Sequence, residues 1–402
     1  MIRRTLTEAL LGRARMYPVV TLTGPRQSGK TTLVRATFPD HAYRSLEDPR
    51  ELDFASSDPV GFLRQPDGAG VILDEVQRRP ELLSYIQGMV DEDPTPARFI
   101  LTGSQNLLLL ARVSQSLAGR TGVLNLMPLS LAELRGRDPV RLERFGALEA
   151  RPGPDDVAAP GGLMRVLRTG FYPRIHDRGI PAEIWLADYV RTYVERDVRE
   201  VLNVGDLESF GRFLRLCAGR SGQLLNLSGL ASDAGVSHTT ARRWISVLEA
   251  SFLVVLLRPH LRNFNKRLVR SPKLFFIDVG LLCYLLRISS DEELYTHSAR
   301  GAIFETFVVA ELLKSSLHRG EDPPLWFWRD SQGHEVDVLI DLGETQVPVE
   351  VKSGETVTGD SFASIRYWRK LTGGTDGPAA LVYGGDRSFV REGVAVRSWR
   401  DV

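Results

Sequence analysis

A short stretch near the N-terminus constrains the fold of this chain more than any other feature. Residues 24–32 read GPRQSGKTT and fit the pattern G-x-x-x-x-G-K-[ST]. An apolar run at 19–22 precedes the stretch, and a helix-compatible run at 33–36 follows it. A buried strand that delivers such a loop to the start of a helix aims backbone N–H groups and the positive helix end at an anion. The stretch therefore predicts a phosphate-binding loop on an α/β sheet.

The chemistry of this loop indicates a nucleoside triphosphate. Lys30 is expected to reach the β- and γ-phosphates, and the Thr31 hydroxyl to bind Mg²⁺. A glycine-rich surface turn is the alternative, but it does not explain why Lys and Thr close the stretch. We therefore expect ATP and Mg²⁺ as cofactors. The residues expected to contact the nucleotide are Gly24, Pro25, Arg26, Gln27, Ser28, Gly29, Lys30, Thr31 and Thr32.

Further apolar runs at 41–46, 70–73, 98–102 and 122–126 alternate with helix-compatible stretches. This alternation predicts a parallel sheet covered by helices. Asp74 and Glu75 end the most apolar run, so we expect Asp74 to hold Mg²⁺ and Glu75 to polarise the attacking water. The alternative is a solvated turn that carries two acids. Ser104 or Gln105, at the next strand end, is expected to sense the γ-phosphate.

Arg120 stands just before the run at 122–126. An arginine at this edge of the sheet would be placed to reach the nucleotide of a neighbouring subunit. A surface arginine without such a role explains the spacing equally well, so both interpretations stay open.

The length and composition limit the class of protein. At 402 residues the chain is expected to form two to four domains, and its net charge of +1 gives no argument for or against nucleic acid. Two cysteines cannot build a disulfide framework, which favours a reducing, cytoplasmic location. The N-terminus has no apolar signal core, and the longest apolar run, 252–257, is too short to cross a bilayer. No membrane partner is expected.

The middle of the chain carries a helix–turn–helix pattern at 227–248. Gly235 permits the tight turn, and Ser237 is a suitable N-cap for the second helix. The apolar run at 252–257 supplies a following strand, which indicates a winged helix. Arg242 and Arg243 would then lie exposed on the second helix and contact DNA, although many such helices bind protein instead.

A basic span follows, because residues 258–273 hold six Lys or Arg and no acid. Lys266 and Arg267 are its expected DNA-contacting residues. Two alternatives stay open: a solvated basic face, and a surface docked on acids of this same protein. Before these elements, the Pro/Gly-rich stretch 151–162 predicts a loop, and the helical stretch 182–202 predicts a lid or a linker.

The C-terminal region places acids in a recognisable pattern. Glu305 lies on a mostly apolar helix at 301–312, and 335–340 and 347–352 form an alternating hairpin around Gly343. Strand parity predicts that Asp337, Glu350 and Lys352 share one face. The opposite face is expected to hold Val336, Val338, Ile340, Val347, Val349 and Val351. Pro348 deletes one ladder N–H and suggests an edge strand or irregular pairing.

This Glu, Asp, Glu-x-Lys arrangement resembles the PD-(D/E)XK nuclease fold. The resemblance implies that Asp337 and Glu350 bind a metal, that Glu305 assists, and that Lys352 lies near the attacking water. An exposed salt-bridged hairpin, or a nuclease fold kept only for binding, is the alternative.

Taken together, the motifs resemble the AAA+ branch of P-loop ATPases, in which the arginine before the last strand acts on the neighbouring subunit. The stretches 189–199 and 266–281 also resemble a widespread prokaryotic family of AAA+ proteins with a nuclease-like C-terminal domain. The resemblance implies an α/β chain with four parts. These are an AAA+ P-loop domain at 1–135, a helical linker or lid at 136–215, a winged helix at 216–262 and a PD-(D/E)XK-like domain at 263–402, with a basic connector at 258–273.

The function expected from these features is ATP hydrolysis by a homo-oligomer, coupled to DNA binding and to cleavage if the C-terminal site is active. Two alternatives remain: an ATP-switched scaffold that binds a protein partner, and a DNA-binding regulator, each with an inactive nuclease fold.

Overall fold

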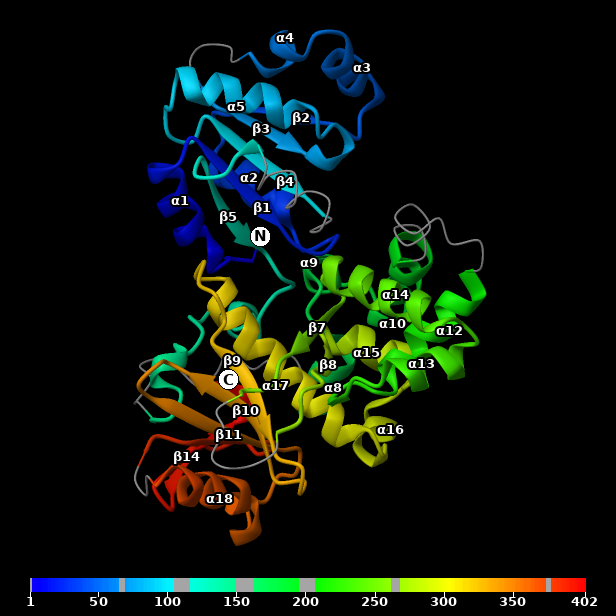
Figure 1. The fold of residues 1–402 in the computed structure, drawn as a ribbon, viewed down its shortest axis with the longest axis vertical. Helices are drawn as coiled ribbons and strands as arrows, with labels where there is room; N and C mark the ends of the chain where they lie inside the picture. Colours follow the sequence, from blue (N-terminus) through cyan, green and yellow to red (C-terminus); the bar gives the residue numbers. More distant parts are fainter. Residues whose placement is uncertain are drawn as a thin grey trace.

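The computed structural model describes residues 2–64, 69–104, 116–148, 162–194, 207–261, 268–373 and 377–402. It has an N-terminal parallel-sheet domain, a mainly helical middle region and a C-terminal mixed sheet, so the predicted α/β class is confirmed (Figure 1). Gln105, Lys266 and Arg267 lie outside the described residues, as does the second half of the stretch at 189–199.

The N-terminal sheet is parallel throughout, in the order β2-β3-β4-β1-β5. Its strands are β1 (Val19–Thr23), β2 (Ala42–Ser45), β3 (Val71–Asp74), β4 (Phe99–Gly103) and β5 (Thr121–Asn125). The helices around it are α1 (Leu6–Met16), α2 (Lys30–Thr37), α3 (Pro49–Ser57), α4 (Pro59–Leu63) and α5 (Leu82–Glu92), with a 3-10 turn, η1 (Val76–Arg78). All five strands that the apolar runs predict are present.

Alternate strand residues explain why helices cover both faces of this sheet. Val20 and Leu22 pack with α1 and α2, whereas Val19, Leu73 and Leu101 pack with α5. A strand that is apolar at every position has no face for water, so each face must be covered.

The middle region follows β5. It holds the helical elements α7 (Leu131–Leu134), η2 (Leu142–Arg144), α8 (Leu163–Thr169), α9 (Pro173–Arg178), α10 (Ala182–Tyr189), the π-helical η3 (Val190–Val194), α12 (Leu207–Ala218), α13 (Leu227–Ala234), α14 (His238–Ala250), α15 (Val279–Leu285) and α16 (Asp291–Thr296). Three short strands, β6 (Gln223–Leu224), β7 (Val254–Leu257) and β8 (Lys273–Phe276), form one sheet in the order β6-β8-β7. β8 pairs with β6 and β7 in this sheet. The predicted domain boundary at residue 263 would place β8 in the C-terminal domain and its two partner strands in the winged helix.

The helix–turn–helix pattern folds as the sequence indicates. Gly235 takes the left-handed φ of 73° that ends α13, and the Ser237 side chain accepts a hydrogen bond from Thr240 N–H at the start of α14. Trp244 is buried, whereas Arg242 and Arg243 are exposed.

The C-terminal sheet is mixed, in the order β13-β14-β12-β11-β10-β9. Its elements are α17 (Arg300–Leu317), β9 (Leu325–Arg329), β10 (Glu335–Asp341), β11 (Gln346–Lys352), η4 (Gly359–Phe362), α18 (Ala363–Thr372), β12 (Ala380–Tyr383), β13 (Phe389–Arg391), β14 (Val394–Ser398) and η5 (Trp399–Asp401). α17 crosses the centre of the molecule between the N-terminal domain and this sheet (Figure 1).

Two details of the predicted hairpin are corrected. β11 is an interior strand, and Pro348 is tolerated there because pairing with β12 begins only at Val349. The register between β9 and β10 shifts between Val336 and Leu339, as at a β-bulge. Val336 therefore packs with Leu339 and Trp368, and not with Val338 in the main core. Strand parity fails at such a bulge.

Part of the basic span docks on the C-terminal sheet. His260 N–H donates to Phe327 O over 2.7 Å, and Val269 N–H donates to Arg329 O over 3.1 Å, so both flanks of residues 262–267 lie along β9. His260 Nε2 also lies 2.9 Å from Asp341 Oδ2. Of the helices in the described residues, none is long and apolar enough to cross a membrane.

Candidate functional site

The loop between β1 and α2 is shaped by two glycines. Gly24 has a φ of 148°, and a Cβ there would lie 2.1 Å from Leu126 O. Gly29 has a left-handed φ of 94° and precedes the first residue of α2. The loop turns tightly only because both positions lack a side chain.

Lys30 is a buried cation at the centre of this loop. Its ammonium donates to Gly24 O over 2.9 Å and to Pro25 O over 2.8 Å, and only 6% of the residue is exposed. Ser28 is also buried, and its hydroxyl oxygen has no hydrogen-bond partner among the described residues. A loop that holds an unpartnered buried hydroxyl and a buried cation suits an anionic ligand, although Ser28 is not among the residues that line the cavity described below.

Asp74 is the centre of a buried network at the end of β3. Thr31 Oγ1 donates to Asp74 Oδ2 over 2.9 Å, and the Tyr43 hydroxyl donates to the same oxygen over 2.8 Å. Thr102, on β4, donates to Asp74 Oδ1. Burial and the bond to Asp74 raise the pKa of Tyr43 to about 12. The predicted ligands Thr31 and Asp74 are therefore brought together, and their adjacent oxygens fit Mg²⁺.

Glu75 stands directly after this network in a rare backbone conformation. Its φ is 57° and its ψ is 45°, the left-handed region that non-glycine residues seldom adopt. Ser104 Oγ donates to Glu75 Oε2 over 3.1 Å, and the Gln77 side-chain amide donates to the same oxygen. The turn thus holds the carboxylate of Glu75 beside Ser104, the residue that the sequence predicts as a γ-phosphate sensor.

A cavity of about 480 Å³ opens over these residues. Its volume is of the size that holds a nucleotide. Three apolar residues from separate segments, Ile2, Leu129 and Pro173, lie in its wall, and α9 contributes Arg174 and Arg178. The predicted residues that line it are Arg26, Gln27, Gly29, Lys30, Thr31, Thr32, Asp74 and Glu75. Ser104 is not among the lining residues, and neither is Arg120.

Arg4 ties the loop to the segment that leads into the middle region. Its guanidinium donates to Ser28 O and to Met127 O, each over 2.7 Å. Arg4 Nε also donates to Glu133 Oε1 over 3.1 Å. The position of the phosphate-binding loop therefore depends on the segment after β5.

Arg120 lies at the N-terminal ends of the parallel strands, whereas the phosphate-binding loop lies at their C-terminal ends. The parallel pairing of β1 with β5 runs from Val19–Thr121 to Thr23–Asn125, so the residue before β5 is remote from the end of β1. Its Nε and Nη2 donate to the two carboxylate oxygens of Asp91 on α5, the second over 2.9 Å, and its Nη1 donates to Ala118 O over 3.1 Å. Hydrogen bonding to Arg120 lowers the pKa of Asp91. The action on a neighbouring subunit stays a prediction.

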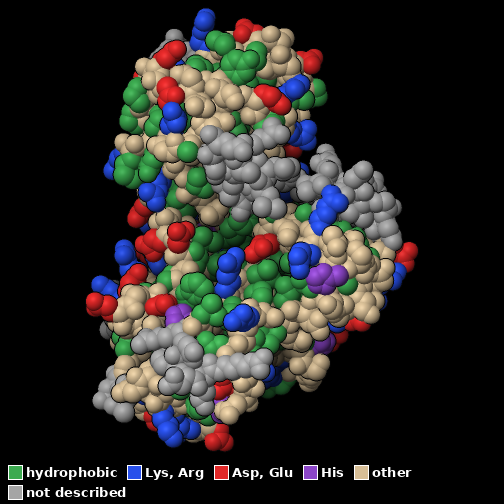
Figure 2. Space-filling model, viewed as in Figure 1, with side chains coloured by type: hydrophobic (Ala, Val, Ile, Leu, Met, Phe, Trp, Pro, Cys, Tyr) green, Lys and Arg blue, Asp and Glu red, His purple; other side chains and the backbone are tan. Residues whose placement is uncertain are grey.

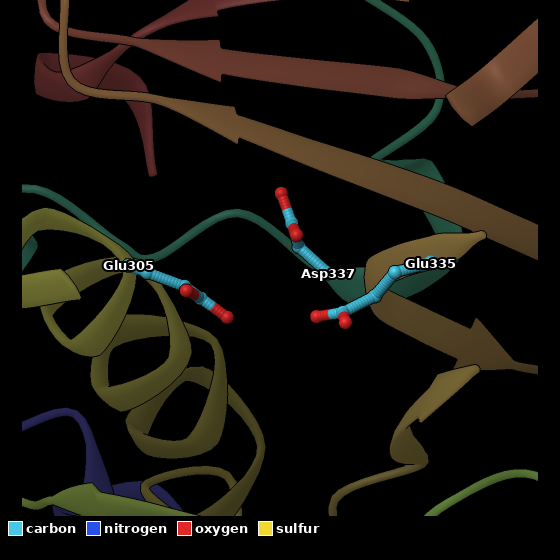
Figure 3. A group of neighbouring side chains, drawn as sticks. All are labelled: Glu305, Glu335 and Asp337. Atoms are coloured by element: carbon cyan, nitrogen blue, oxygen red, sulfur yellow. The ribbon is translucent and has the colours of Figure 1, made fainter. Parts of the chain in front are cut away.

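The C-terminal acids form a cluster beside Lys273, the last residue of the basic span, for which docking on this protein's own acids is one of the interpretations left open. Carboxylate oxygens of Glu305, Glu335 and Asp337 lie within 4.8 Å of one another. Figure 3 shows Glu305 extending from α17 toward Glu335 and Asp337 on β10. The Lys273 ammonium lies 2.8 Å from Glu305 Oε1 and also contacts Glu335. Burial raises the pKa of Glu305 to about 8, and the ammonium of Lys273 opposes this rise.

Glu350, next to this cluster, has partners of its own. Lys352 and the Ser364 hydroxyl each contact its carboxylate. Burial, together with the negative charge of Asp337, raises the pKa of Glu350 to about 7. The structure thus places Asp337 next to Glu305 and Glu335, and gives Glu350 the separate partners Lys352 and Ser364. The metal-binding roles of these acids stay a prediction.

Charged side chains elsewhere on the surface are mixed in sign. On the face that Figure 2 shows, Lys and Arg are interspersed with Asp and Glu among the described residues. The figure also shows a hollow between the upper N-terminal domain and the lower body. A nucleic-acid surface must therefore be argued from individual exposed cations, of which Arg242 and Arg243 are two.

Comparison with known proteins divides the chain into three matched segments. An AAA domain matches residues 16–135, a Domain of unknown function (DUF8612) matches 162–292, and a Domain of unknown function (DUF4143) matches 300–400. Two relatives are the Uncharacterized protein Mb2031c of Mycobacterium bovis and the Uncharacterized protein Rv2008c of Mycobacterium tuberculosis. Each is 31% identical over 362 residues, which cover 89% of this chain and 75% of the relative. The chain belongs to the family of these two proteins.

Two solved structures are similar to this chain at low sequence identity. The Walker-type ATPase PABY2304 of Pyrococcus abyssi is 17% identical, with a TM-score of 0.42 over 71% of this chain and 96% of that one. AMPPCP-bound DnaA from Aquifex aeolicus is 17% identical, with a TM-score of 0.30 over 61% and 85%. The AAA domain match and the cavity together make the N-terminal domain of this family member a P-loop ATPase of the AAA type.

Sequence reasoning missed four functional candidates in this family member: Arg4, Arg174, Arg178 and Lys273. The sequence places Lys273 within a basic span that either binds DNA, stays solvated or docks on this protein's own acids, without naming the acids that it meets, and the other three residues belong to no motif. A weak signal existed at Glu133, because Ser130 and Glu133 have capping-box spacing and form that box at the start of α7. The partnership of Glu133 with Arg4, 129 residues apart in sequence, has no local signature.

Proposed function

We propose that this protein hydrolyses ATP with Mg²⁺ in the cavity above β1 and β3, and that the nucleotide state controls DNA binding by α14. The observation that carries the proposal is the convergence of Lys30, Thr31, Asp74 and Glu75 on one cavity of about 480 Å³. A cation, a hydroxyl, a buried carboxylate and a second carboxylate are the groups that phosphoryl transfer to water requires.

Each residue has a separate role in the proposed reaction. Lys30 and the N–H groups of the loop bind the phosphates, and the α9 cations Arg174 and Arg178 approach them from the other wall of the cavity. Thr31 and Asp74 would hold Mg²⁺, which neutralises charge on the phosphates. The carboxylate of Glu75 accepts a hydrogen bond from the attacking water and orients it toward the γ-phosphate.

The proposed coupling passes through α9. This short helix belongs to the middle region, yet it lies in the cavity wall, so loss of the γ-phosphate removes an attraction between the two parts. Arg242 and Arg243 are exposed on α14 of the same region and are positioned to bind phosphates of a duplex. A homo-oligomer in which Arg120 of one copy completes the site of another is part of this proposal.

A second candidate function is an ATP-switched scaffold that binds a protein partner and whose nuclease-like fold is inactive. Two observations favour it. The described flanks of the basic span lie along β9, and the acids of the C-terminal cluster are bonded to this chain's own cations. The two candidates share the ATPase site and differ in the partner that the middle region binds.

The test is steady-state ATP hydrolysis with Mg²⁺, measured with and without duplex DNA. Lys30→Ala should lose tight ATP binding, and Glu75→Gln should bind ATP but turn it over slowly. Glu81→Gln is the matched control, because Glu81 is an exposed acid outside the cavity. Normal turnover by Glu75→Gln would refute the assigned role of Glu75. If ATP turnover and ATP affinity are the same with and without duplex DNA, the scaffold function is favoured.

A further inference from the structure

Lys273 is an almost completely buried cation, so its side chain is not accessible to DNA. It opens β8, where its backbone pairs with Leu224 of β6 and Leu257 of β7, and only 2% of the residue is exposed. The ammonium lies 5.6 Å from the centre of the Phe327 ring on β9. A lysine buried to this degree needs carboxylate partners to stay charged.

Those partners come from the other region of the chain. Glu305 lies on α17 and Glu335 on β10, and the Lys273 ammonium contacts both. The carboxylates of Glu305, Glu335 and Asp337 are close enough together to surround one cation. Asp337, which the nuclease-like resemblance assigns to a metal, and Glu305, which it has assist, therefore already lie with Glu335 beside a positive charge.

Two further oxygens of the cluster are also engaged. Asp337 Oδ2 accepts a hydrogen bond from Val351 N–H over 2.9 Å, and Glu335 Oε2 lies 3.0 Å from Arg329 Nη1. Glu350 is bonded to Lys352 and Ser364. Four acids thus face three cations, Lys273, Arg329 and Lys352, before any ion is added. A divalent metal at this point would meet strong repulsion from the Lys273 ammonium.

We infer that Glu305, Glu335 and Asp337 form a cation site whose occupant is the ammonium of Lys273, which takes the place of a divalent metal and joins β8 of the middle region to the C-terminal sheet. The nuclease-like acids thereby serve as an internal ion-pair site. This inference does not depend on ATP hydrolysis, because none of its residues lies in the nucleotide cavity.

The test is Mn²⁺ binding to the full chain without nucleotide, followed by electron paramagnetic resonance and calorimetry. All variants carry Asp74→Asn and Glu75→Gln, which remove the two carboxylates assigned to Mg²⁺ and to the attacking water in the nucleotide cavity, so that bound Mn²⁺ reports on the C-terminal cluster. The background protein should show no saturable Mn²⁺ site. Adding Lys273→Met should create one site, and adding Asp337→Asn to that variant should abolish it. Lys273→Arg, which keeps the positive charge, should create none.

Two results would overturn the inference. One is a saturable Mn²⁺ site in the background protein that Glu305→Gln removes, because the acids would then bind metal beside Lys273. The other is a folded Lys273→Met variant without a new site. If Lys273→Met does not fold, the background protein and its Glu305→Gln variant decide the question alone.

Discussion

Arg4 and Glu133 form a buried ion pair between the N-terminal segment and the start of α7, with 3.1 Å between Nε and Oε1. Glu133 also accepts hydrogen bonds from the backbone N–H groups of Thr5 and Ser130. Because the same guanidinium holds Ser28 O, this pair fixes the phosphate-binding loop against the segment after β5.

Replacing Arg4 should therefore destabilise the protein strongly. Arg4→Met leaves the buried Glu133 carboxylate with only the His318 ring, 3.4 Å away, as a possible cationic partner. Breaking a buried pair in this way costs about 3–5 kcal/mol. Arg3→Met is the matched control, because the neighbouring side chain is 68% exposed, and an exposed change is expected to stay within about 0.5 kcal/mol. Urea unfolding measures both. Equal losses in the two variants would show that the pair contributes nothing specific.

Stability should fall as the pH drops below the ordinary histidine range. Burial lowers the pKa of His318 and of His176 in the folded protein. His318 Nε2 accepts a hydrogen bond from Met127 N–H over 3.2 Å. Protonation of the ring would place a proton on Nε2, and this hydrogen bond would be lost. Since the unfolded chain takes up these protons below about pH 6.5, the stability that the neutral rings provide is complete above that pH and is lost below it.

The measurement is the free energy of unfolding in urea between about pH 7.5 and about pH 5.5, where each histidine contributes at most about 1.4 kcal/mol per pH unit. His318→Gln should make the decline shallower, because one of the two titrating rings is gone. His238→Gln, at an exposed position on α14, should leave the slope unchanged. An unaltered slope in His318→Gln would contradict this explanation.

If Arg120 acts on the nucleotide of a neighbouring subunit, Arg120→Ala should lower ATP turnover by about a thousandfold or more with little change in ATP affinity. Mixing this variant with Lys30→Ala should restore some activity at shared interfaces. Asp91→Asn frees the guanidinium from its present partner and should not lower turnover. Full activity of a strictly monomeric wild type, checked by light scattering during turnover, would exclude the role.

Charge reversal on α14 tests the DNA surface. Arg242→Glu with Arg243→Glu should weaken duplex binding, and the wild-type affinity should fall steeply with salt because phosphate contacts release counterions. Arg212→Glu with Arg215→Glu is the matched control, since it makes the same charge change on exposed residues of α12. Fluorescence anisotropy at several salt concentrations reports both effects. Affinity that is the same in the two double variants would favour a protein partner.

The parts of the site that could be predicted from sequence are those built by consecutive residues. Lys30 and Thr31 follow a glycine-rich loop, and Asp74 and Glu75 end an apolar strand, so local pattern and local structure coincide there. The five-stranded sheet was predicted for the same reason.

What could not be predicted depends on contacts between distant segments. Lys273 meets Glu305 and Glu335 only because β8 packs against the C-terminal sheet, and its sequence neighbours suggested a DNA-binding span. Strand parity likewise failed at Val336, because a bulge adds a residue that no alternating pattern reveals. The Lys273 contacts depend on packing between two regions of the chain, and the bulge depends on the pairing of β9 with β10. The local sequence of one segment indicates neither of them.

α17 has a mechanical consequence. A helix of 18 residues is a stiff rod about 27 Å long. Glu305 is near its first turn, while at its far end Lys314 donates to Leu129 O over 2.9 Å and His318 accepts from Met127 N–H. Leu129 lines the nucleotide cavity. Because the helix is stiff, we expect a displacement of Leu129 by the nucleotide to move Glu305 relative to Lys273. The distance between the Glu305 and Lys273 side chains would then report the nucleotide state.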